Sequence, residues 1–538
     1  MSTEALQRDR WERLLSVFAR LRPGEGRSVA YFMTYGFLVM FCYYMLKTLR
    51  ETLLLSQATA EMKSYAYAVI ALILLFVVPI YGALYRRLPN RELNVWIAGI
   101  LLAVQFVFFF LSHTGLNIGF AYYVWVGIFG VLITAQFWAF AADTFNVKAG
   151  QRLFPLIMIG VSLGGLVGPA LAGRLLQTMG PPELMYMVMV VLAFMLPMTA
   201  RSRDAVPPSA RSVQTAHTGS RSEIPGGFAY VLRNHYLLLI AAMVVLLNWV
   251  NTTGEYILAE FVLQHADALI AEDPRLDKSH IIAGFYGNFF ALINALSLVI
   301  QLFFVARLIE WLGVNGTLLI VPIIALIGYG LMVFIPVFTM IRLVKILEDT
   351  ADYSVMNTAR QSLFLPLSAA ETYQSKIAID GFFWRFGDLI QALAIYVGLH
   401  LYGLEAQHFA ALNMVLALVW LGLAMLIGRR YLTLKKQATL GESPSLLQVL
   451  RPHPIPPGSR LDYQLPMNLF HCEPGDMLEI TVRSADGDKL PGWLKFDPES
   501  WRFYGIAPIG LYGNTWLTVR ATNIDGQWVE TRLGFIHQ

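Results

Sequence analysis

Residues Val29 to Leu55 read VAYFMTYGFLVMFCYYMLKTLRETLLL, an apolar run long enough to cross a bilayer as one helix. The run nevertheless carries Lys47, Arg50 and Glu51, and offsets of three and four residues place charged side chains on one helix face. Each charge costs about 2.5–3.5 kcal/mol at the bilayer centre, so this face must line a watery cavity or meet opposite charge within the protein. The stretch predicts a polar pathway through a membrane, suited to a charged solute.

Composition extends this prediction to most of the chain. Hydrophobic residues make up 56% of the 538 residues and charged residues 14%, far from the balance of a soluble globular domain. Apolar stretches of roughly 17–25 residues, the length of a spanning helix, recur about twelve times over the first 430 or so positions. We therefore predict an all-α polytopic membrane protein with 12 transmembrane helices.

Two stretches of loop-like composition divide the chain. Residues 201 to 227, rich in Pro, Ser and Arg, separate the apolar stretches six and six, and the Pro-rich residues 437 to 458 precede a tail of different character. The predicted organisation is a cytoplasmic N-terminal segment (1–28), a first six-helix half (29–200), a cytoplasmic linker (201–234), a second six-helix half (235–432), a linker (433–458) and a β-sandwich (459–538).

Basic residues mark the predicted cytoplasmic side. The N-terminal segment, alternate loops and the segment after the last span hold most of the Lys and Arg, among them Arg86, Lys148 and Arg429. The opposite loops are short and nearly free of basic residues, so the positive-inside rule places both termini in the cytoplasm. The N-terminal segment lacks an apolar core with a cleavage site, and we expect no cleavable signal peptide. The expected location is the inner (cell) membrane, crossed many times and in contact with the lipid bilayer.

Several function classes are excluded. Topology and the polar pathway explain the net charge of +4, so we expect no nucleic-acid partner. The sequence has no zinc finger, Walker loop or dinucleotide fingerprint, and we expect no cofactor, no metal site and no catalytic residues. Cys42 and Cys472 are the two cysteines, too few for a disulfide framework. A membrane transporter fits these observations and an enzyme does not.

Charged residues recur in the later spans and near their cytoplasmic ends. Several stand three or four residues apart, as Lys345 and Asp349 do, and so share a helix face. One interpretation is that they neutralise each other as structural pairs or gates. Their number exceeds what packing requires, and we predict that some contact an anionic substrate. The candidate residues for substrate binding and translocation are Lys47, Arg50, Glu51, Asp143, Arg152, Glu255, Lys345, Asp349, Arg360, Lys376, Asp380 and Arg385.

Motifs in both sets of spans resemble those of a known superfamily. GALYRRLPNR at residues 82–91 and ARLIEWLG at residues 306–313 occupy equivalent places in the two sets. They resemble the cytoplasmic loop motif of the major facilitator superfamily, and GGLVGPALAG at residues 164–173 resembles its antiporter motif. The small residues of that motif serve either ordinary close packing or a hinge. The resemblance implies two six-helix halves related by an axis along the membrane normal.

Other segments narrow the resemblance. LKTLRE at residues 46–51, FWAFAAD at 137–143, residues 148–155 and residues 345–380 are similar to the ATP:ADP antiporter family. In that family, charged residues of spans one, four, seven and ten contribute to transport. The resemblance implies a secondary active transporter that exchanges nucleotides, or related phosphorylated anions, by alternating access. The matching positions here are Lys47, Arg50, Glu51, Asp143, Glu255, Lys345 and Asp349.

The sequence leaves alternatives open. An envelope precursor, a peptide or another solute is a possible cargo, and a transporter-derived body can also act as a membrane sensor or scaffold. Proton symport stands beside exchange, because buried carboxyls such as Glu255, Asp349 and Asp380 can take up protons. Aromatic residues at helical spacing either stack on a base or simply pack, namely Tyr43, Tyr44, Trp138, Trp249 and Tyr256.

The tail alternates short apolar runs with turns, which predicts a β-sandwich. LPGWLKFD at residues 490–497 and FYGIAP at 503–508 resemble the cadherin-like, dystroglycan-type immunoglobulin domain. Because topology places this domain in the cytoplasm, we expect a protein partner rather than adhesion. The acidic turn residues Asp486, Asp488 and Asp525 either ligate calcium or only form turns.

Overall fold

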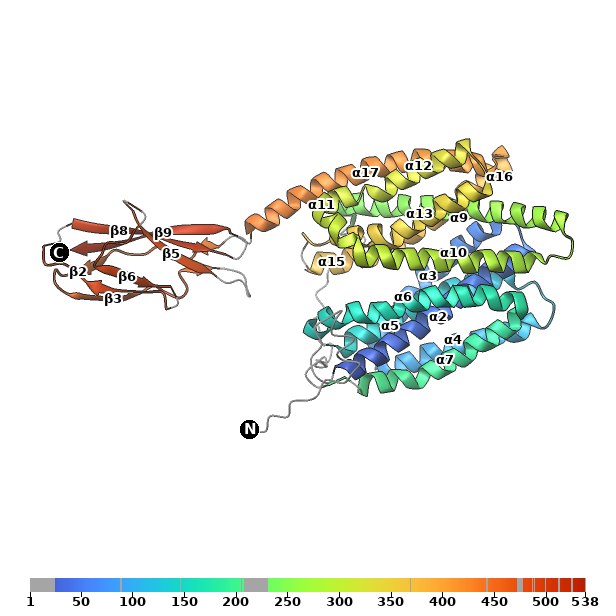
Figure 1. The fold of residues 1–538 in the computed structure, drawn as a ribbon, viewed down its shortest axis with the longest axis horizontal. Coiled ribbons are helices and arrows are strands. Elements are labelled where there is room, and N and C mark those ends of the chain that lie inside the picture. The colour runs from blue at the N-terminus through green and yellow to red at the C-terminus, as the bar shows by residue number, and fades with distance from the viewer. Residues whose placement is uncertain are drawn as a thin grey trace. The chain divides into compact units, whose positions relative to one another are not determined.

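The computed structural model describes residues 25–87, 90–145, 147–204, 206–207, 231–367, 369–441, 444–471, 478–485, 487, 489–498, 500–510, 513–523 and 526–537. The chain divides into two compact units, Met1–Arg430 and Tyr431–Gln538. The first unit is helical, and most of the second is built from strands (Figure 1).

The first half of the helical unit contains antiparallel helices joined by short connections. Its apolar core includes Phe32, Phe129 and Phe137, all fully buried. These helices are α2 (Gly26–Gln57), α3 (Glu61–Arg87), α4 (Asn90–Ser112), α5 (Gly119–Thr144), α6 (Val147–Thr178) and α7 (Pro181–Asp204).

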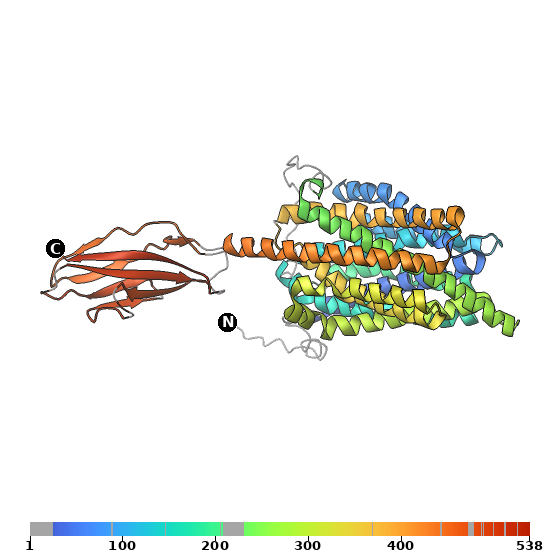
Figure 2. The same ribbon diagram turned by 90° about the horizontal axis from the view of Figure 1, so that it is seen from above.

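The second half is more interrupted. Two π-helical turns, η1 and η2, break its fourth and fifth segments, and such turns are frequent at functional sites. Its elements are α9 (His235–Glu272), α10 (Lys278–Phe303), α11 (Val305–Thr317), α12 (Ile320–Phe334), α13 (Phe338–Ala351), η1 (Asp352–Met356), α14 (Asn357–Ser362), α15 (Ala369–Lys376), η2 (Ile377–Phe383), α16 (Trp384–Tyr402) and α17 (Ala406–Gly441). Figure 2 shows these helices running along the unit from a second direction.

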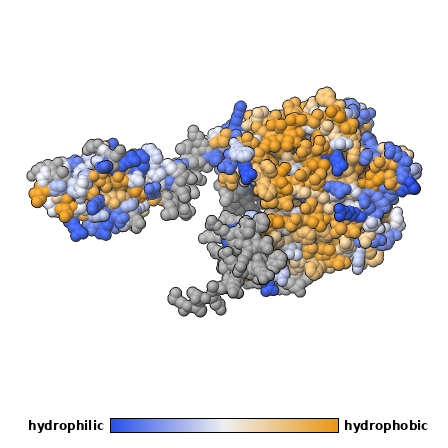
Figure 3. All heavy atoms as spheres, in the orientation of Figure 1, coloured by the Kyte–Doolittle hydropathy of each residue, from blue (hydrophilic) through white to orange (hydrophobic). Residues whose placement is uncertain are grey.

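The helices have the length and hydropathy of membrane spans. Eight described helices are long and apolar enough to cross a membrane, and α11 with α12, bent by 72°, adds a ninth. Shorter apolar stretches occur in α4 and α7. The tenth apolar stretch of the sequence, residues 338–365, forms α13 to α14 and is less apolar because it buries Lys345, Glu348 and Asp349. Figure 3 shows hydrophobic residues along the helices and hydrophilic ones at their ends. The predicted polytopic helical membrane fold is confirmed.

Glycines of α6 pack this helix on two sides. A Cβ added at Gly168 would lie 2.7 Å from the Phe41 carbonyl oxygen of α2, so a larger residue would force the helices apart. On another side, a Cβ added at Gly173 would lie 2.9 Å from Cα of Gly287 in α10. The antiporter-like motif therefore packs α6 both within its own half and against the other half.

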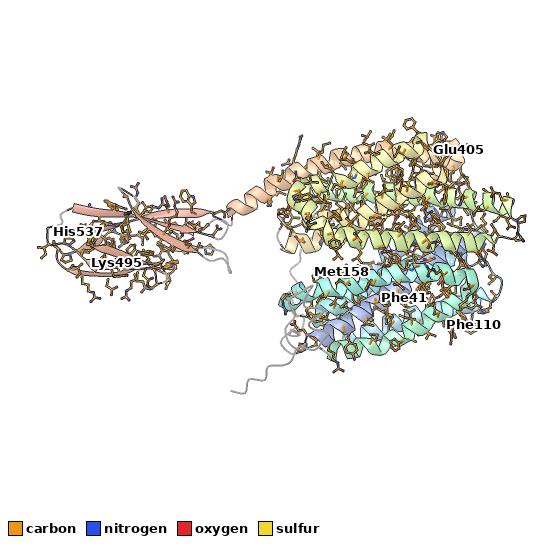
Figure 4. All side chains as sticks on the ribbon, in the orientation of Figure 1. Phe41, Phe110, Met158, Glu405, Lys495 and His537 are labelled. Carbon is orange, nitrogen blue, oxygen red and sulfur yellow. The ribbon has the colours of Figure 1, made fainter. Side chains whose placement is uncertain are left out.

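The helices α6 and α10 separate toward the end of the unit where α2 begins. There the residues of the two helices line an apolar cavity of about 770 Å³, with Met158 and Ser162 on α6 and Leu298 and Leu302 on α10. Figure 4 labels Met158 at the border between the halves. The two halves thus pack closely near Gly173 of α6, and an apolar cavity lies between them near Met158.

The strand unit has two sheets around one apolar core. The sheet orders are β2-β9-β8-β5 and β3-β7-β6, with β2 parallel to β9 and a separate pair β1-β4. Phe503 of one sheet and Phe535 of the other are both fully buried in this core. The predicted β-rich tail is confirmed, whereas Cys472, Asp486, Asp488 and Asp525 lie outside the described residues. The strands are β1 (Ser445–Leu446), β2 (His453–Ile455), β3 (Arg460–Gln464), β4 (Phe470–His471), β5 (Glu479–Ser484), β6 (Leu494–Asp497), β7 (Arg502–Ile506), β8 (Gly513–Thr522) and β9 (Trp528–His537).

Candidate functional site

A cavity of about 370 Å³ lies between the two halves. Its walls come from α2, α3 and α5 of the first half and from α9, η1, α14 and α16 of the second. Both halves contribute to one site, as in transporters whose halves enclose a central binding site. The lining residues are Tyr43, Lys47, Arg50, Tyr67, Ile70, Gly127, Val131, Asn248, Asn251, Thr252, Glu255, Asp352, Tyr353, Asn357, Arg360, Trp384, Arg385 and Asp388.

Two cations of α2 line this cavity. The Lys47 ammonium lies 4.2 Å from the centre of the Phe290 ring, and no carboxylate of the described residues forms an ion pair with it. The Arg50 guanidinium lies 4.3 Å from the centre of the Tyr123 ring, and its Nη2 is 3.5 Å from Oε1 of Glu51. Arg50 is 3% exposed, yet its Nε donates no hydrogen bond. Both cations keep donors available to a ligand.

A buried lysine of α3 joins the two halves. Lys63 Nζ lies 3.0 Å from Oε2 of Glu51 and 2.6 Å from Oε2 of Glu255, which belongs to α9 of the second half. The other oxygen of Glu51 accepts a hydrogen bond of 2.9 Å from the Tyr123 hydroxyl. Lys63 is 0% exposed. Sequence reasoning did not select Lys63, although it bridges two residues that were selected.

A second buried lysine sits on α13. Lys345 Nζ lies 2.9 Å from Oε2 of Glu348, 2.9 Å from Oδ1 of Asp349 and 3.0 Å from Oδ1 of Asn251. Glu348 also accepts a hydrogen bond of 2.8 Å from the Tyr329 hydroxyl. Two carboxylates therefore share one ammonium in the interior of the second half.

The remaining cavity cations have acidic neighbours. Arg385 Nη1 lies 3.2 Å from Oδ2 of Asp388, whose Oδ1 accepts a hydrogen bond of 2.7 Å from Asn248. Arg360 Nη1 lies 3.3 Å from Oδ1 of the exposed Asp380, but the pair lacks hydrogen-bond geometry and Nη1 has no hydrogen-bond partner. This contact is therefore an electrostatic pair, and Nη1 remains a free donor.

Polar contacts join the two halves at the end of the helical unit where α3 begins. Gln391 of α16 donates a hydrogen bond of 2.9 Å to the Ser64 hydroxyl of α3, and both side chains are buried. Nearby, Nε2 of His400 lies 3.2 Å from Oε2 of Glu61. Together with the glycine contact of α6 and α10, these pairs close one end, and the apolar cavity between α6 and α10 lies toward the other.

The structure brings many of the predicted site residues together. Beside the cavity, Glu51, Lys345 and Asp349 are buried in the ion pairs described above. Asp380 is the acidic neighbour of Arg360. The predicted residues that line the cavity are Lys47, Arg50, Glu255, Arg360 and Arg385.

Other predicted residues lie elsewhere. Arg152 forms two hydrogen bonds, of 3.1 and 2.8 Å, with the Glu25 carboxylate, and it does not line the cavity. Lys376 Nζ lies 5.3 Å from the centre of the Phe364 ring, also away from the lining. The side chain of Asp143 is outside the described part of the chain. Among the described residues, no group of three or more His, Cys, Asp or Glu side chains is arranged to hold a metal ion.

Comparison with known proteins supports a transporter. No family model matches the chain. It is similar to the ADP,ATP carrier protein 1 of Chlamydia pneumoniae, 22% identical over 374 residues that cover 60% of this chain and 70% of the carrier. It is also similar to the ADP,ATP carrier protein 1 of Chlamydia trachomatis serovar D, 21% identical over 358 residues, 58% of this chain and 65% of the carrier.

Solved structures share the fold at low sequence identity. The nucleoside transporter NupG matches with a TM-score of 0.51 and 12% identity, over 76% of this chain and 99% of that one. An inward-facing bacterial homologue of the iron transporter ferroportin matches with a TM-score of 0.52 and 13% identity, over 75% and 98%. The chain is therefore a weak homologue of ADP,ATP carriers with a major facilitator fold, and these relatives and structural neighbours are transporters rather than enzymes.

Proposed function

We propose that this protein transports nucleotides, or related phosphorylated anions, by alternating access, with exchange of ATP and ADP as the leading form. The observation that carries the proposal is a set of cations with unused donors in one cavity. Lys47 has no carboxylate partner among the described residues, and neither Arg50 Nε nor Arg360 Nη1 donates a hydrogen bond. Phosphate oxygens accept hydrogen bonds from such groups and balance their charge.

Acidic residues of the cavity are compatible with an anionic cargo. Glu255 is paired with Lys63, and Asp388 is paired with Arg385. An entering polyphosphate competes with Asp388 for Arg385, whose guanidinium has five N–H donors in total. Binding then exchanges one anionic partner for another, which suits a carrier that must release its cargo on the far side.

The same cavity has features for a nucleobase. Tyr43, Tyr67 and Trp384 supply aromatic rings on different helices, and planar bases stack on such rings. Asp352 also lines the cavity and offers a carboxylate that accepts hydrogen bonds from an exocyclic amine. The volume of about 370 Å³ falls within the range of about 300–1,000 Å³ typical of small-molecule sites.

Alternating access follows from the contacts between the halves. Opening the closed end requires the breaking of the Lys63–Glu255 pair and of the Ser64–Gln391 hydrogen bond, while the free ends of α6 and α10 approach each other. We propose that the protein lies in the inner membrane with both termini in the cytoplasm, because basic residues gather on the side of the membrane where the termini lie. The present conformation is then open toward the cytoplasm.

Ligand-dependent unfolding tests the binding step. A ligand that binds the folded state raises stability, by about 2.7 kcal/mol at 100 times its Kd. We expect ATP and ADP to raise the unfolding temperature of the purified protein more than adenosine does, and Arg360→Ala to reduce that shift. Lys278→Ala, at an exposed ion pair with Asp267, is the control and should keep the shift. Equal shifts with adenosine and ATP would argue against phosphate recognition.

We also propose that the strand unit binds a cytoplasmic protein. The exposed positions of β7 include Tyr504 and Ile506, which are 44% and 66% exposed. Large side chains on an accessible strand suit contact with another protein. A chain that ends at residue 443 should transport at the rate of the full chain in liposomes, since no partner is present there. A lost transport rate would instead assign the unit to the transport cycle.

A further inference from the structure

The acidic residues around Lys345 outnumber the cation they share. Lys345, Glu348 and Asp349 are 0%, 3% and 2% exposed. The ammonium lies 2.9 Å from a carboxylate oxygen of each acid. It donates hydrogen bonds to Glu348 and to Asn251, and Asp349 is the acceptor of neither bond. One positive charge therefore faces two buried carboxylates.

The two carboxylates are not equally satisfied. Glu348 accepts hydrogen bonds from Lys345 and from the Tyr329 hydroxyl. Oδ1 of Asp349 is buried and accepts no hydrogen bond, even though the Lys345 ammonium is near. A buried charge without full hydrogen bonding is costly, and such a group becomes neutral by taking up a proton. Asp349 is the group for which protonation relieves that cost.

Among the described residues, Lys345 is the cation that forms ion pairs with Glu348 and Asp349. Glu255, the acidic neighbour on α9, shares Lys63 with Glu51, so that its negative charge is only partly balanced and acts on Asp349 as well. The phenols near Asp349 are neutral groups. The titratable and charged groups around the cluster are Tyr44 and Lys47 of α2, Lys63 of α3, Glu255 of α9, Tyr329 of α12, Lys345 and Glu348 of α13, Asp352 and Tyr353 of η1, and Arg360 of α14 beside Asp352.

We infer that Asp349, with Glu348 and Lys345, forms a proton-binding site that exchanges protons with the central cavity. Asp352 follows Asp349 by three residues, one helical turn, and lines the cavity. Water in the cavity gives a proton to Asp352, which passes it to the Asp349 carboxylate, and release follows the reverse route. The π-helical turn η1 begins at Asp352, so proton occupancy acts on an irregular segment of the cavity wall.

The assignment gives the transporter a coupling ion. A protonated Asp349 leaves the cluster neutral, whereas its deprotonation leaves an uncompensated negative charge next to the anion-binding cations. Cargo binding and proton binding are then linked through charge, as in any pair of sites that share a coupling free energy. This coupling rests on the proposed transport of anions, while the proton site stands without it.

Infrared spectroscopy tests the site without any cargo. For the full chain in liposomes, we expect the carbonyl band of a protonated carboxylic acid at neutral pH, shifted in D₂O and reversibly lost as the pH rises. Asp349→Asn should abolish this band, and Glu348→Gln should change its frequency or the pH at which it disappears. Asp267→Asn, which alters an exposed ion pair, should leave it unchanged.

The outcomes separate the two proposals. Absence of a protonated carboxyl band at neutral pH, or a band that survives Asp349→Asn and Glu348→Gln unchanged, overturns the proton site whatever the cargo is. A band that does not titrate while the protein stays folded overturns exchange with the cavity. A titrating band that depends on Asp349 supports the site even when ATP and ADP fail to bind.

Discussion

Lys63 shows how a single residue can escape sequence reasoning. The apolar stretch of the second span begins at Tyr65, so hydropathy places Lys63 in a loop, whereas helix α3 begins at Glu61 and buries it. Its partner Glu255 is 192 residues away in the sequence, and no local spacing reveals that pair. One signal in the sequence could have identified Lys63: it is a lysine on the predicted non-cytoplasmic side, where the loops are otherwise poor in basic residues.

Removal of Lys63 should be strongly destabilising. In Lys63→Ala, the buried carboxylates Glu51 and Glu255 lose their shared cation, and breaking a buried pair typically costs about 3–5 kcal/mol. We expect a clear fall in the unfolding temperature of the protein in detergent, measured by scanning fluorimetry. Adding Glu255→Gln should recover part of the loss, because one of the stranded charges is then removed.

A part-exposed lysine provides the comparison. Lys278 pairs with Asp267, and these side chains are 33% and 60% exposed. Surface pairs contribute about 0–1 kcal/mol, so Lys278→Ala should barely change the unfolding temperature. Similar losses for the two alanine variants would contradict the structural role given to Lys63.

Charged residues of the first span illustrate what the sequence could predict. A shared helix face was expected either to line a cavity or to pair, and the structure contains both arrangements. Lys47 and Arg50 line the cavity, and Glu51 is paired with Lys63. The helical period places these residues together, but which partner each one finds depends on helices distant in the sequence. Their roles in transport remain predictions.

At the scale of elements, apolar stretches predicted helices well and their interruptions poorly. Long hydrophobic runs form spans because backbone polar groups must be satisfied within the helix in a bilayer. The π-helical turns η1 and η2 were not expected, and neither was the break inside α11 at Gly313, where φ is +68°. Such breaks depend on tertiary packing around the chain, which hydropathy does not report.

The contact of α6 with α10 should help to keep the two halves closed at the end where α3 begins. In Gly173→Leu, the new side chain meets backbone atoms of Gly287 and Ala283, which cannot move aside as a flexible side chain would. We expect the closed end to open more often. A cysteine at position 64, Ser64→Cys, should then react faster with a membrane-impermeant maleimide, because Ser64 is 1% exposed in the closed arrangement.

A glycine in open space serves as the control. A Cβ added at Gly99 of α4 meets nothing within 4 Å, so Gly99→Leu should leave the labelling rate of the cysteine at position 64 unchanged. Labelling that is unaffected by Gly173→Leu, or accelerated equally by both variants, would refute the role of the glycine contact.

The start of α10 allows a test of pH dependence. Asp277 caps this helix, accepting hydrogen bonds from the backbone N–H groups of Ser279 and His280, and the Ser279 side-chain hydrogen bond is the main cause that lowers the pKa of Asp277. The carboxylate is thus favoured in the folded state. Its stabilisation is present above the pKa of an unfolded Asp, about 3.9, and is lost as the pH falls through the lower folded value.

Substitution of the cap should follow the same pH dependence. Asp277→Ala should lower stability near neutral pH by about 0.5–2 kcal/mol, as is usual for loss of an N-cap. The unfolding temperatures of the unsubstituted protein and of Asp277→Ala should converge as the pH falls below the range in which the Asp277 carboxylate takes up a proton. A difference that persists unchanged into acid would show that the Asp277 carboxylate does not cap α10.

At the scale of the whole molecule, a polytopic helical fold and a β-rich tail were predictable, and the central cavity was predictable only in outline. Its lining comes from seven elements spread between Tyr43 and Asp388. Charges were expected there, but the arrangement of acids around Lys345 and Lys63 arises from packing of distant helices. Cargo identity is not fixed by the fold, because one fold supports many cargoes.

Exchange in liposomes tests the central proposal most directly. Purified protein is reconstituted into liposomes loaded with ADP, and the uptake of labelled ATP is compared with uptake into liposomes without nucleotide. We predict rapid uptake that requires internal ADP, a loss of roughly tenfold or more in Lys47→Ala, corresponding to about 1.4 kcal/mol, and no loss in Lys278→Ala. Uptake that is indifferent both to internal ADP and to Lys47→Ala would contradict nucleotide exchange at this cavity.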